Sequence, residues 1–341
     1  MKKLLYLILI SILQITHLEN GFAEEHGQGV QAEVKSKVPM VHDPVMIKHN
    51  DTYYLFCTGR GVTVMSSKDM QEWTQQKPVF EKAPEWAVNL IPGFKGHIWA
   101  PDIIFYQGQY HLFYSCSAFG KNTSAIGHAT NPTLDPSDPE FKWTDHGLLL
   151  QSVPNRDSWN AIDPNIIIDG EGTPWMNFGS FWDGIKLVKL KKDMSAIEYP
   201  EEWRSICRRN YHPVRADNTE ANDNSVEAPF IMHHGDYYYL FVSFDFCCRG
   251  AKSDYKIAVG RSREVTGPYL DKEGKSLAAG GGTVVLKGNE TWAGVGHCAA
   301  YRFGDKDYLI AHGYYMPDEG VSKLVLREMH WDDNGWPVVS W

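Results

Sequence analysis

Five segments of the chain share one pattern of polar and apolar positions, in which a turn residue is followed by a short run rich in aromatic side chains. These runs begin at Asp51, Gly108, Gly172, Gly235 and Asp305, so they recur at intervals of 57, 64, 63 and 70 residues. A short apolar run precedes each turn, at residues 45–48, 103–106, 166–169, 230–233 and 300–303. An apolar strand, a turn and an aromatic strand predict a β-hairpin in every repeat.

The repeats predict a propeller. Further strand candidates follow four of the hairpins, at residues 61–66, 124–128, 185–190 and 255–260. Three or four antiparallel strands in a repeat of about 64 residues are typical of a propeller blade. We therefore predict an all-β fold, a single five-bladed β-propeller over residues 24–341. A β-sandwich with coincidental spacing is the alternative, which the near-even intervals disfavour.

The first 23 residues have the order of a secretory signal. Lys2 and Lys3 precede an apolar run from Leu4 to Ile15, and polar residues then lead to a cleavage site at Gly21-Phe22-Ala23. The run is too short to cross a bilayer, which needs about 20 apolar residues. We predict a signal peptide at residues 1–23, a secreted or periplasmic protein and no membrane contact after cleavage. A buried N-terminal helix is the alternative.

The composition limits the possible partners. Aromatic residues make up 13% of the chain, which is enough to build a large core, and the formal net charge is −9. No cluster of Lys and Arg offers the basic face that binds nucleic acid, so we expect no nucleic-acid partner. We also expect a monomer. Of the six cysteines, Cys57 and Cys116 lie in apolar runs and are expected to be buried. The adjacent Cys247 and Cys248 form either a vicinal disulfide or two free thiols.

Chemically different residues stand just before the first strand of four repeats. Asp43, Asp163, Glu227 and His297 each lie 8 or 9 residues before the turn residue. The innermost strands of a propeller begin near its axis, so we expect these side chains to converge on one cavity. Alone, an Asp-Pro pair is a common turn. Equivalent positions with unlike chemistry favour a composite functional site instead.

Three carboxylates in one confined site can supply an acid and a base at the same pH, because like charges raise one of the pKa values. Inverting glycoside hydrolysis requires that combination. We predict Asp43 as the general base, Glu227 as the general acid, and Asp163 as the orienter of the acid and modulator of its pKa. His297 is either a hydrogen-bonded core residue or a group that holds a cation through water, and a single histidine is a weak metal signal.

Aromatic faces stack on sugars, and amides bond their hydroxyl groups. Most of the aromatic residues are expected between blades. Four of them lie beside the predicted catalytic motifs or in polar loops and are candidates for sugar contact, together with one amide: Trp99, Phe119, Phe181, Trp182 and Asn160.

Several motifs occur in a recognisable order: VHDPV at residues 41–45, GHIWAPD at 96–102, WNAIDP at 159–164, FGSFW at 178–182, VEAPF at 226–230 and GVGH at 294–297. Together they resemble the arabinanases of glycoside hydrolase family 43. The resemblance covers residues 40–338. It implies a five-bladed propeller that cleaves α-1,5-linked L-arabinan internally and with inversion, with arabinan and arabino-oligosaccharides as substrates. The three carboxylates take the roles given above.

The resemblance also implies a substrate site and a metal. It implies substrate contacts at Gly120, Asn160, Ala161, Ile162, Ser180, Phe181 and Trp182. It suggests that His297 helps to hold a hydrated calcium ion in the axial channel. The alternatives are an exo-acting arabinanase, a β-xylosidase or arabinofuranosidase of the same family, and a non-catalytic sugar-binding propeller. A lectin propeller tends to repeat one site in each blade, whereas the positions here differ.

Overall fold

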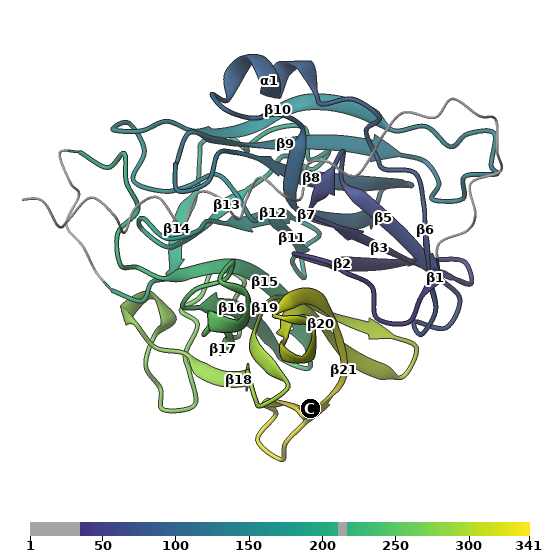
Figure 1. Ribbon diagram of the computed structural model, residues 1–341. Coiled ribbons are helices and arrows are strands. Elements are labelled where there is room, and N and C mark those ends of the chain that lie inside the picture. The colour runs from purple at the N-terminus through teal and green to yellow at the C-terminus, as the bar shows by residue number, and fades with distance from the viewer. Residues whose placement is uncertain (1–34, 211–216) are drawn as a thin grey trace, which may run out of the picture. The chain divides into compact units, whose positions relative to one another are not determined.

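The computed structural model describes residues 35–210 and 217–341. The predicted signal peptide at residues 1–23 lies outside them and stays a prediction. From Lys35 to Trp341 the described chain forms one unit, in which the strands make five antiparallel sheets (Figure 1). The α-helix of this part of the chain is α1 (Glu85–Leu90), accompanied by short 3-10 turns. Among the described residues, no helix is long and apolar enough to cross a membrane.

Each sheet contains a four-stranded meander. The first two meanders are β2 (Val45–His49), β3 (Thr52–Cys57), β5 (Thr63–Ser67) and β6 (Trp73–Gln75), then β7 (His97–Tyr106), β8 (Gln109–Cys116), β9 (Ser124–Asn131) and β10 (Thr144–Ser152). The third is β11 (Asn165–Ile168), β12 (Pro174–Phe178), β13 (Ile185–Lys189) and β14 (Trp203–Cys207). The last two are β15 (Val226–His234), β16 (Tyr237–Phe244), β17 (Lys256–Ser262) and β18 (Thr283–Lys287), then β19 (Trp292–Phe303), β20 (Lys306–Tyr315), β21 (Val321–Trp331) and β22 (Pro337–Val339). Two short strands extend the first two sheets, β1 (Lys35–Ser36) beside β6 and β4 (Gly59–Arg60) beside β7.

The five-bladed propeller is confirmed. Each predicted hairpin is present, and the first strand of each meander contacts the first strand of the next blade. The ring closes where β19 contacts β2. Pro39 strengthens the closure, because its carbonyl accepts the N–H of Leu324 at 3.0 Å. The first strands therefore surround one axis, as the repeat pattern predicted.

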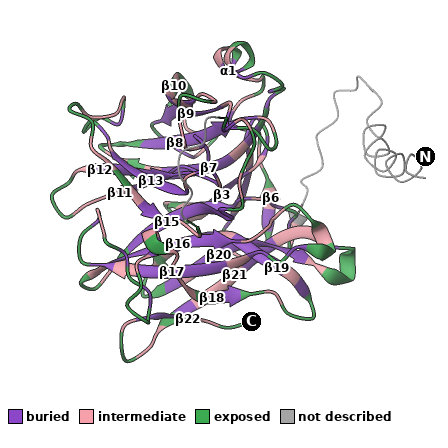
Figure 2. Ribbon diagram, turned by 90° about the vertical axis from the view of Figure 1, so that its left-hand side faces the viewer, coloured by how far each residue is buried: buried purple, intermediate pink, exposed green. Residues whose placement is uncertain are grey.

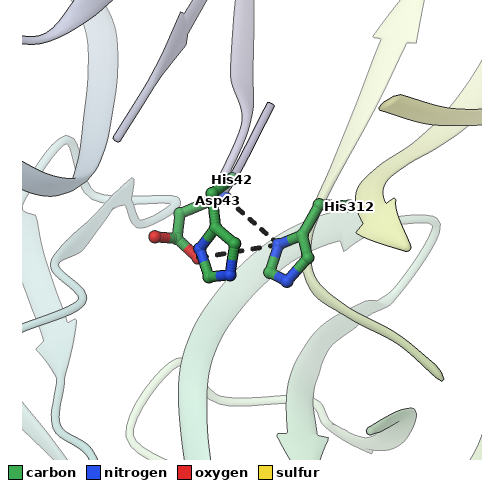
Figure 3. Close-up of side chains that lie close together, drawn as sticks. All are labelled: His42, Asp43 and His312. Carbon is green, nitrogen blue, oxygen red and sulfur yellow. Dashed lines mark hydrogen bonds and ion pairs between the residues drawn. The ribbon is translucent and has the colours of Figure 1, made fainter. Parts of the chain in front are cut away.

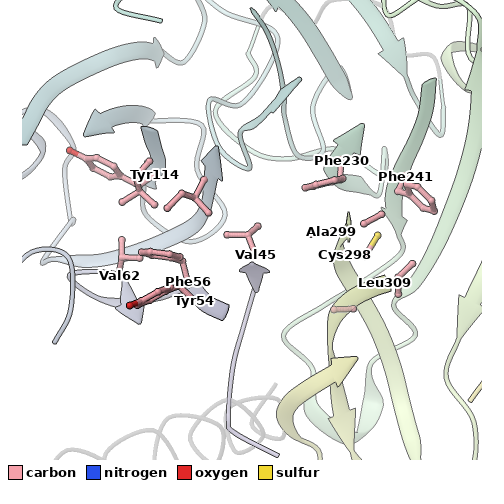
Figure 4. Close-up of a cluster of buried hydrophobic side chains, with 14 of the residues drawn as sticks. Val45, Tyr54, Phe56, Val62, Tyr114, Phe230, Phe241, Cys298, Ala299 and Leu309 are labelled. Atoms are coloured by element: carbon pink, nitrogen blue, oxygen red, sulfur yellow. The ribbon is translucent and has the colours of Figure 1, made fainter. Parts of the chain in front are cut away.

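The repeated aromatic strands are buried on both faces, which explains the aromatic content. Along β3, Tyr54 and Phe56 belong to a buried cluster that includes Tyr114 of the second blade (Figure 4). Leu55 and Cys57 belong to another cluster, which includes Ile310 and Leu324 of the fifth blade. Side chains of a strand alternate between its two faces, so a strand between two blades needs apolar residues at consecutive positions. Figure 2 shows the resulting burial along the central strands, with exposed residues concentrated in the connections.

Candidate active site

Every blade has a backbone kink immediately before or within its first strand. The kinked residues are Asp43 (φ 54°), Ala100 (φ 40°), Asp163 (φ 57°), Ala228 (φ 53°) and His297 (φ 50°). L-residues rarely adopt positive φ, so this conformation persists only where the surroundings fix it. Three of the four residues predicted to be equivalent, Asp43, Asp163 and His297, occupy this position.

Glu227 does not, and that part of the prediction is wrong. Glu227 pairs with Ser243 across β15 and β16, just as Gly296 pairs with His312 across β19 and β20. The kinked residue of the fourth blade is the next one, Ala228. Neighbouring residues of a strand point to opposite faces, so a one-residue offset sets Glu227 apart from the kinked residues.

Each kinked N–H donates a hydrogen bond to a side chain of the preceding blade. In four blades the acceptor stands directly after, or in, the second strand: Thr58 Oγ1 for Ala100 (2.8 Å), Ser115 Oγ for Asp163 (3.1 Å), Ser243 Oγ for His297 (2.7 Å) and His312 Nδ1 for Asp43 (3.1 Å). These bonds satisfy buried donors that the kink removes from the sheet, and they tie each blade to the next.

The third blade has Gly179 at the acceptor position, with no side chain to offer. A Cβ at Gly179 would lie 2.5 Å from the carbonyl oxygen of Gly184, so the site excludes a larger residue. The N–H of Ala228 instead donates to Asp163 Oδ2 at 3.0 Å. Because Gly179 offers no acceptor, the Asp163 carboxylate takes its place in this set of hydrogen bonds. The bond anchors Asp163 beside Ala228, the residue that follows Glu227.

Asp43 is buried and surrounded by imidazole nitrogens (Figure 3). Its Oδ1 lies 2.8 Å from His42 Nδ1, 3.0 Å from His297 Nδ1 and 3.6 Å from His312 Nδ1. Its Oδ2 accepts the hydroxyl of Thr58 at 2.5 Å. Burial alone would raise the pKa of Asp43, but His297 and His42 outweigh it and hold the pKa well below its usual value. Asp43 is therefore ionised at neutral pH.

The three imidazoles do not share one protonation state. Burial opposes protonation of His42 and His297, but the Asp43 carboxylate outweighs it and raises their pKa to about 10 and about 9. For His312, burial and the charge of His42 both act the other way, so its pKa falls well below the ordinary value. A neutral His312 agrees with its geometry, since its Nδ1 accepts the backbone N–H of Asp43.

Glu227 and Asp163 form the second half of the site. Glu227 Oε1 accepts the hydroxyl of Tyr255 at 2.8 Å, and Oε2 accepts the hydroxyl of Ser180 at 2.8 Å. Burial raises the pKa of Asp163; His297 opposes the shift, and the charges of Glu227 and Asp43 add to it, giving about 8. The Asp163 carboxyl is therefore protonated more readily than an ordinary aspartate beside the Glu227 carboxylate. The site thus combines Asp43, whose pKa is lowered, with Asp163, whose pKa is raised.

Four of the residues predicted to bind sugar offer accessible surface. Phe119 is 79% exposed, and Gly120 beside it is exposed with a φ of 73°. Trp99 and Phe181 are partly buried. Phe181 follows Ser180, which binds Glu227, and its ring centroid lies 5.8 Å from that of Phe246. Sugar contact by these four residues remains a prediction.

The other five predicted contacts are buried: Asn160, Ala161, Ile162, Ser180 and Trp182. Trp182 is 6% exposed, and its indole N–H donates to the carbonyl of Asn218 at 2.7 Å, so it leaves little ring surface for a sugar. Asn160 Oδ1 is buried with no hydrogen-bond partner among the described residues, so it retains an acceptor for a ligand. Direct contact by these residues also remains a prediction.

Sequence reasoning missed the residues that fix the carboxylates, namely Thr58, Ser115, Tyr255 and His312. The sequence did contain a signal for Thr58, Ser115 and His312. Thr58, Ser115, Gly179, Ser243 and His312 stand at the same place relative to the aromatic strand in the five repeats, and four of them carry a polar side chain. Tyr255 gave no such signal, because its burial beneath Glu227 depends on the packing of the fourth and fifth blades.

The residues near His297 offer few oxygen ligands for the predicted calcium ion. Within the described ranges, ligand atoms of His42, Asp43 and His312 lie within 4.8 Å of one another and could hold a metal ion. His297 is outside that group, although it contacts the same Asp43 oxygen. Calcium takes six to eight oxygen ligands, whereas imidazole suits zinc, copper or nickel. The donor set does not fit direct coordination of calcium, and it is compatible only with an ion that keeps most of its water.

Comparison with known proteins agrees with this geometry. The family model described as glycosyl hydrolases family 43 matches residues 38–337. The chain belongs to glycosyl hydrolase family 43. The match spans all five blades, and so includes the three carboxylates and the ring of kinked residues.

Family 43 relatives of known name align along most of the chain. The chain is 50% identical over 300 residues to the extracellular exo-α-(1→5)-L-arabinofuranosidase ArbA of Cellvibrio japonicus, covering 88% of this chain and 86% of that protein. It is 42% identical to the extracellular endo-α-(1→5)-L-arabinanase 1 of Bacillus subtilis, covering 87% of each. The structure of the Cellvibrio cellulosa α-L-arabinanase complexed with arabinohexaose matches with a TM-score of 0.87 and 49% identity, covering 89% of this chain and 96% of that one.

Proposed function

We propose that this family 43 protein is an arabinanase that hydrolyses α-1,5-L-arabinofuranosidic bonds with inversion. The observation that carries the proposal is the placement of the two carboxyl groups that would act. Buried histidines keep Asp43 ionised, and the hydroxyl groups of Tyr255 and Ser180 hold Glu227. An inverting glycosidase needs a carboxylate to activate water and a carboxylic acid to protonate the leaving oxygen. The arabinanase names of the relatives support arabinan as the substrate.

In this proposal Asp43 is the general base. Thr58, His42 and His297 fix its orientation and keep it ionised, so that it can accept a proton from water as the water attacks the anomeric carbon. Glu227, held by Tyr255 and Ser180, donates a proton to the departing sugar oxygen. Asp163 orients the acid, because its Oδ2 accepts the N–H of Ala228, the residue next to Glu227. Each turnover ends when Asp43 releases its proton and Glu227 regains one.

Two modes of cleavage are candidates. The resemblance of the motifs predicts internal, endo cleavage, and the Bacillus relative bears an endo name at 42% identity. The Cellvibrio relative, at 50% identity, bears an exo name, and this higher identity favours exo cleavage. A β-xylosidase activity has no specific observation in its favour.

The test is a time course on linear arabinan with the purified protein. Chain lengths of the early products distinguish the modes, because endo action releases mixed mid-length oligosaccharides and exo action releases one small product from the start. Proton NMR of the first product gives its anomeric configuration. Retention of configuration would refute the proposed roles of Asp43 and Glu227, and unchanged arabinan would favour a sugar-binding propeller.

Three accompanying proposals concern the setting of the enzyme. The extracellular names of the relatives support secretion, which agrees with the predicted signal peptide. We propose that the protein acts as a monomer. We also propose that His297 and Asp43 adjoin a largely hydrated calcium ion, which when bound would add positive charge beside the base and help to keep it ionised.

A further inference from the structure

Two adjacent thiols, Cys247 and Cys248, stand beside the active site without a role in the proposed reaction. They follow β16, and their Sγ atoms lie 2.8 Å apart as free thiols. A disulfide joins sulfur atoms at about 2.0 Å, so the pair is close to bonding distance. The other four cysteines are buried, whereas Cys248 is exposed and Cys247 partly so. Solvent therefore reaches this pair preferentially.

The backbone around the pair is fixed on both sides. Cys248 has a φ of 58°, and its N–H donates to the hydroxyl oxygen of Tyr314 at 2.6 Å. The preceding Phe246 is bound at both polar atoms, with its N–H donating to Asp254 at 3.0 Å and its carbonyl accepting the hydroxyl of Ser253 at 2.8 Å. A non-glycine residue held at positive φ by its surroundings is typical of a functional constraint. The two sulfur atoms are thus held together by the fold rather than by chance rotation of a loose loop.

A short series of contacts connects the pair to the proposed general base. Cys248 Sγ lies 3.8 Å from His42 Nε2, and the opposite ring nitrogen of His42 lies 2.8 Å from Asp43 Oδ1. Tyr314 reinforces the connection, because its hydroxyl contacts both the Cys248 N–H and His42 Nε2, the latter at 3.0 Å. A rearrangement of Cys248 would therefore change the surroundings of His42, which helps to orient Asp43.

We propose that Cys247 and Cys248 form a redox modification site that closes reversibly into a vicinal disulfide and thereby lowers the activity of the enzyme. The oxidant is a low-molecular-weight disulfide. The thiolate of Cys248 attacks one sulfur of the oxidant, forming a mixed disulfide and releasing one small thiol. Cys247 then attacks the sulfur of Cys248 and releases the second small thiol. Two electrons and two protons pass to the oxidant, and a reducing thiol reverses both steps.

The effect on activity follows from the geometry and rests on the proposed function. Closing the bond draws Cys248 Sγ toward Cys247 and rotates the peptide whose N–H is bound by Tyr314. His42 then loses its sulfur neighbour and part of the contact that fixes its outer nitrogen. We expect Asp43 to be less well oriented, so kcat on linear arabinan falls several-fold while KM changes little.

The experiment uses the full secreted chain incubated with oxidised glutathione and then with a reducing thiol. Intact mass and peptide mapping are expected to show the loss of two hydrogens within the peptide that contains Cys247 and Cys248, with no glutathione retained. Cys247→Ser is the matched variant, because it leaves Cys248 in contact with His42 but removes the resolving thiol. This variant is expected to keep one glutathione on Cys248.

The outcomes separate this proposal from the proposed function, because mass detects the disulfide whether or not arabinan is cleaved. Persistence of glutathione on the unsubstituted protein, or two unreacted thiols, would overturn the redox site. A disulfide that forms while kcat stays unchanged would overturn its effect on activity. Thermal unfolding of the Cys247→Ser variant verifies that the protein is folded, and its kcat before oxidation is expected to match that of the unsubstituted protein.

Discussion

Replacing Thr58 by valine is expected to damage the general base without changing the shape of the side chain. The Thr58 hydroxyl donates to Asp43 Oδ2 at 2.5 Å and accepts the N–H of Ala100 at 2.8 Å, so one oxygen serves the carboxylate and the kink of the next blade. Valine keeps the branched shape but removes both bonds. Thr58→Ser is the matched control, because it keeps the oxygen and loses only a methyl group.

The magnitude follows from the charge on the acceptor. A hydrogen bond to a charged group contributes about 1.5–3 kcal/mol, and each 1.4 kcal/mol changes a rate about tenfold. If the bond orients Asp43 for catalysis, Thr58→Val lowers kcat/KM about 10–100-fold. The buried Ala100 N–H also loses its acceptor, which costs about 1–3 kcal/mol of the free energy of unfolding.

The pH dependence gives a second readout. Surrounding groups hold the pKa of Asp43 well below its usual value, because they favour the charged form despite its burial. Loss of the Thr58 donor raises this pKa, so the acidic limb of the rate profile moves to higher pH in the valine variant. The same change weakens the stability that ionised Asp43 contributes above the unfolded-state pKa, which is lost as pH falls through the folded-state pKa.

The assay is the initial rate of reducing-sugar release from linear arabinan between acidic and neutral pH, with thermal unfolding of each variant. We expect Thr58→Ser to keep the acidic limb and most of the activity. A valine variant with an unshifted acidic limb and unsubstituted rates would refute the positioning role. Equal loss in both variants would show that the methyl group, rather than the hydroxyl, is what Asp43 requires.

Three further predictions test other parts of the molecule. Glu227→Gln is expected to abolish hydrolysis of arabinan while retaining affinity for arabino-oligosaccharides by calorimetry, and hydrolysis at the unsubstituted rate would exclude Glu227 as the acid. Burial lowers the pKa of His128 to about 3, so its stabilising contribution is full above the unfolded pKa near 6.5 and lost as pH falls. His128→Gln should therefore lose about 2 kcal/mol less stability between pH 7 and pH 5 in urea titrations, and parallel losses would contradict this. Removal of calcium with a chelator should lower both kcat and the melting temperature, each restored by added calcium; insensitivity of both would rule out the hydrated ion near His297.

Local patterning predicted the blades because each strand carries its own signal. The run at residues 52–57 alternates side chains toward two neighbouring blades, so both faces are apolar and the strand is visible without its partners. The same regularity made the positions before each first strand comparable along the chain. This comparison placed Asp43 and Asp163 correctly at the kinked positions. It did not reveal the one-residue offset that places Ala228, rather than Glu227, at the kink of the fourth blade.

The sequence by itself determined the repeat and the five hairpins and singled out the three carboxylates as candidates, since these depend on residue types at short and regular spacing. Only the tertiary structure decided how the carboxylates are held. The partners of Asp43 include His312 and His297, which lie more than 250 residues away in the chain, and they reach it because the fifth blade closes the ring against the first. The contact between Cys248 and His42 has the same origin. Such contacts leave no local pattern, because closure of the propeller, rather than spacing along the chain, brings these side chains together.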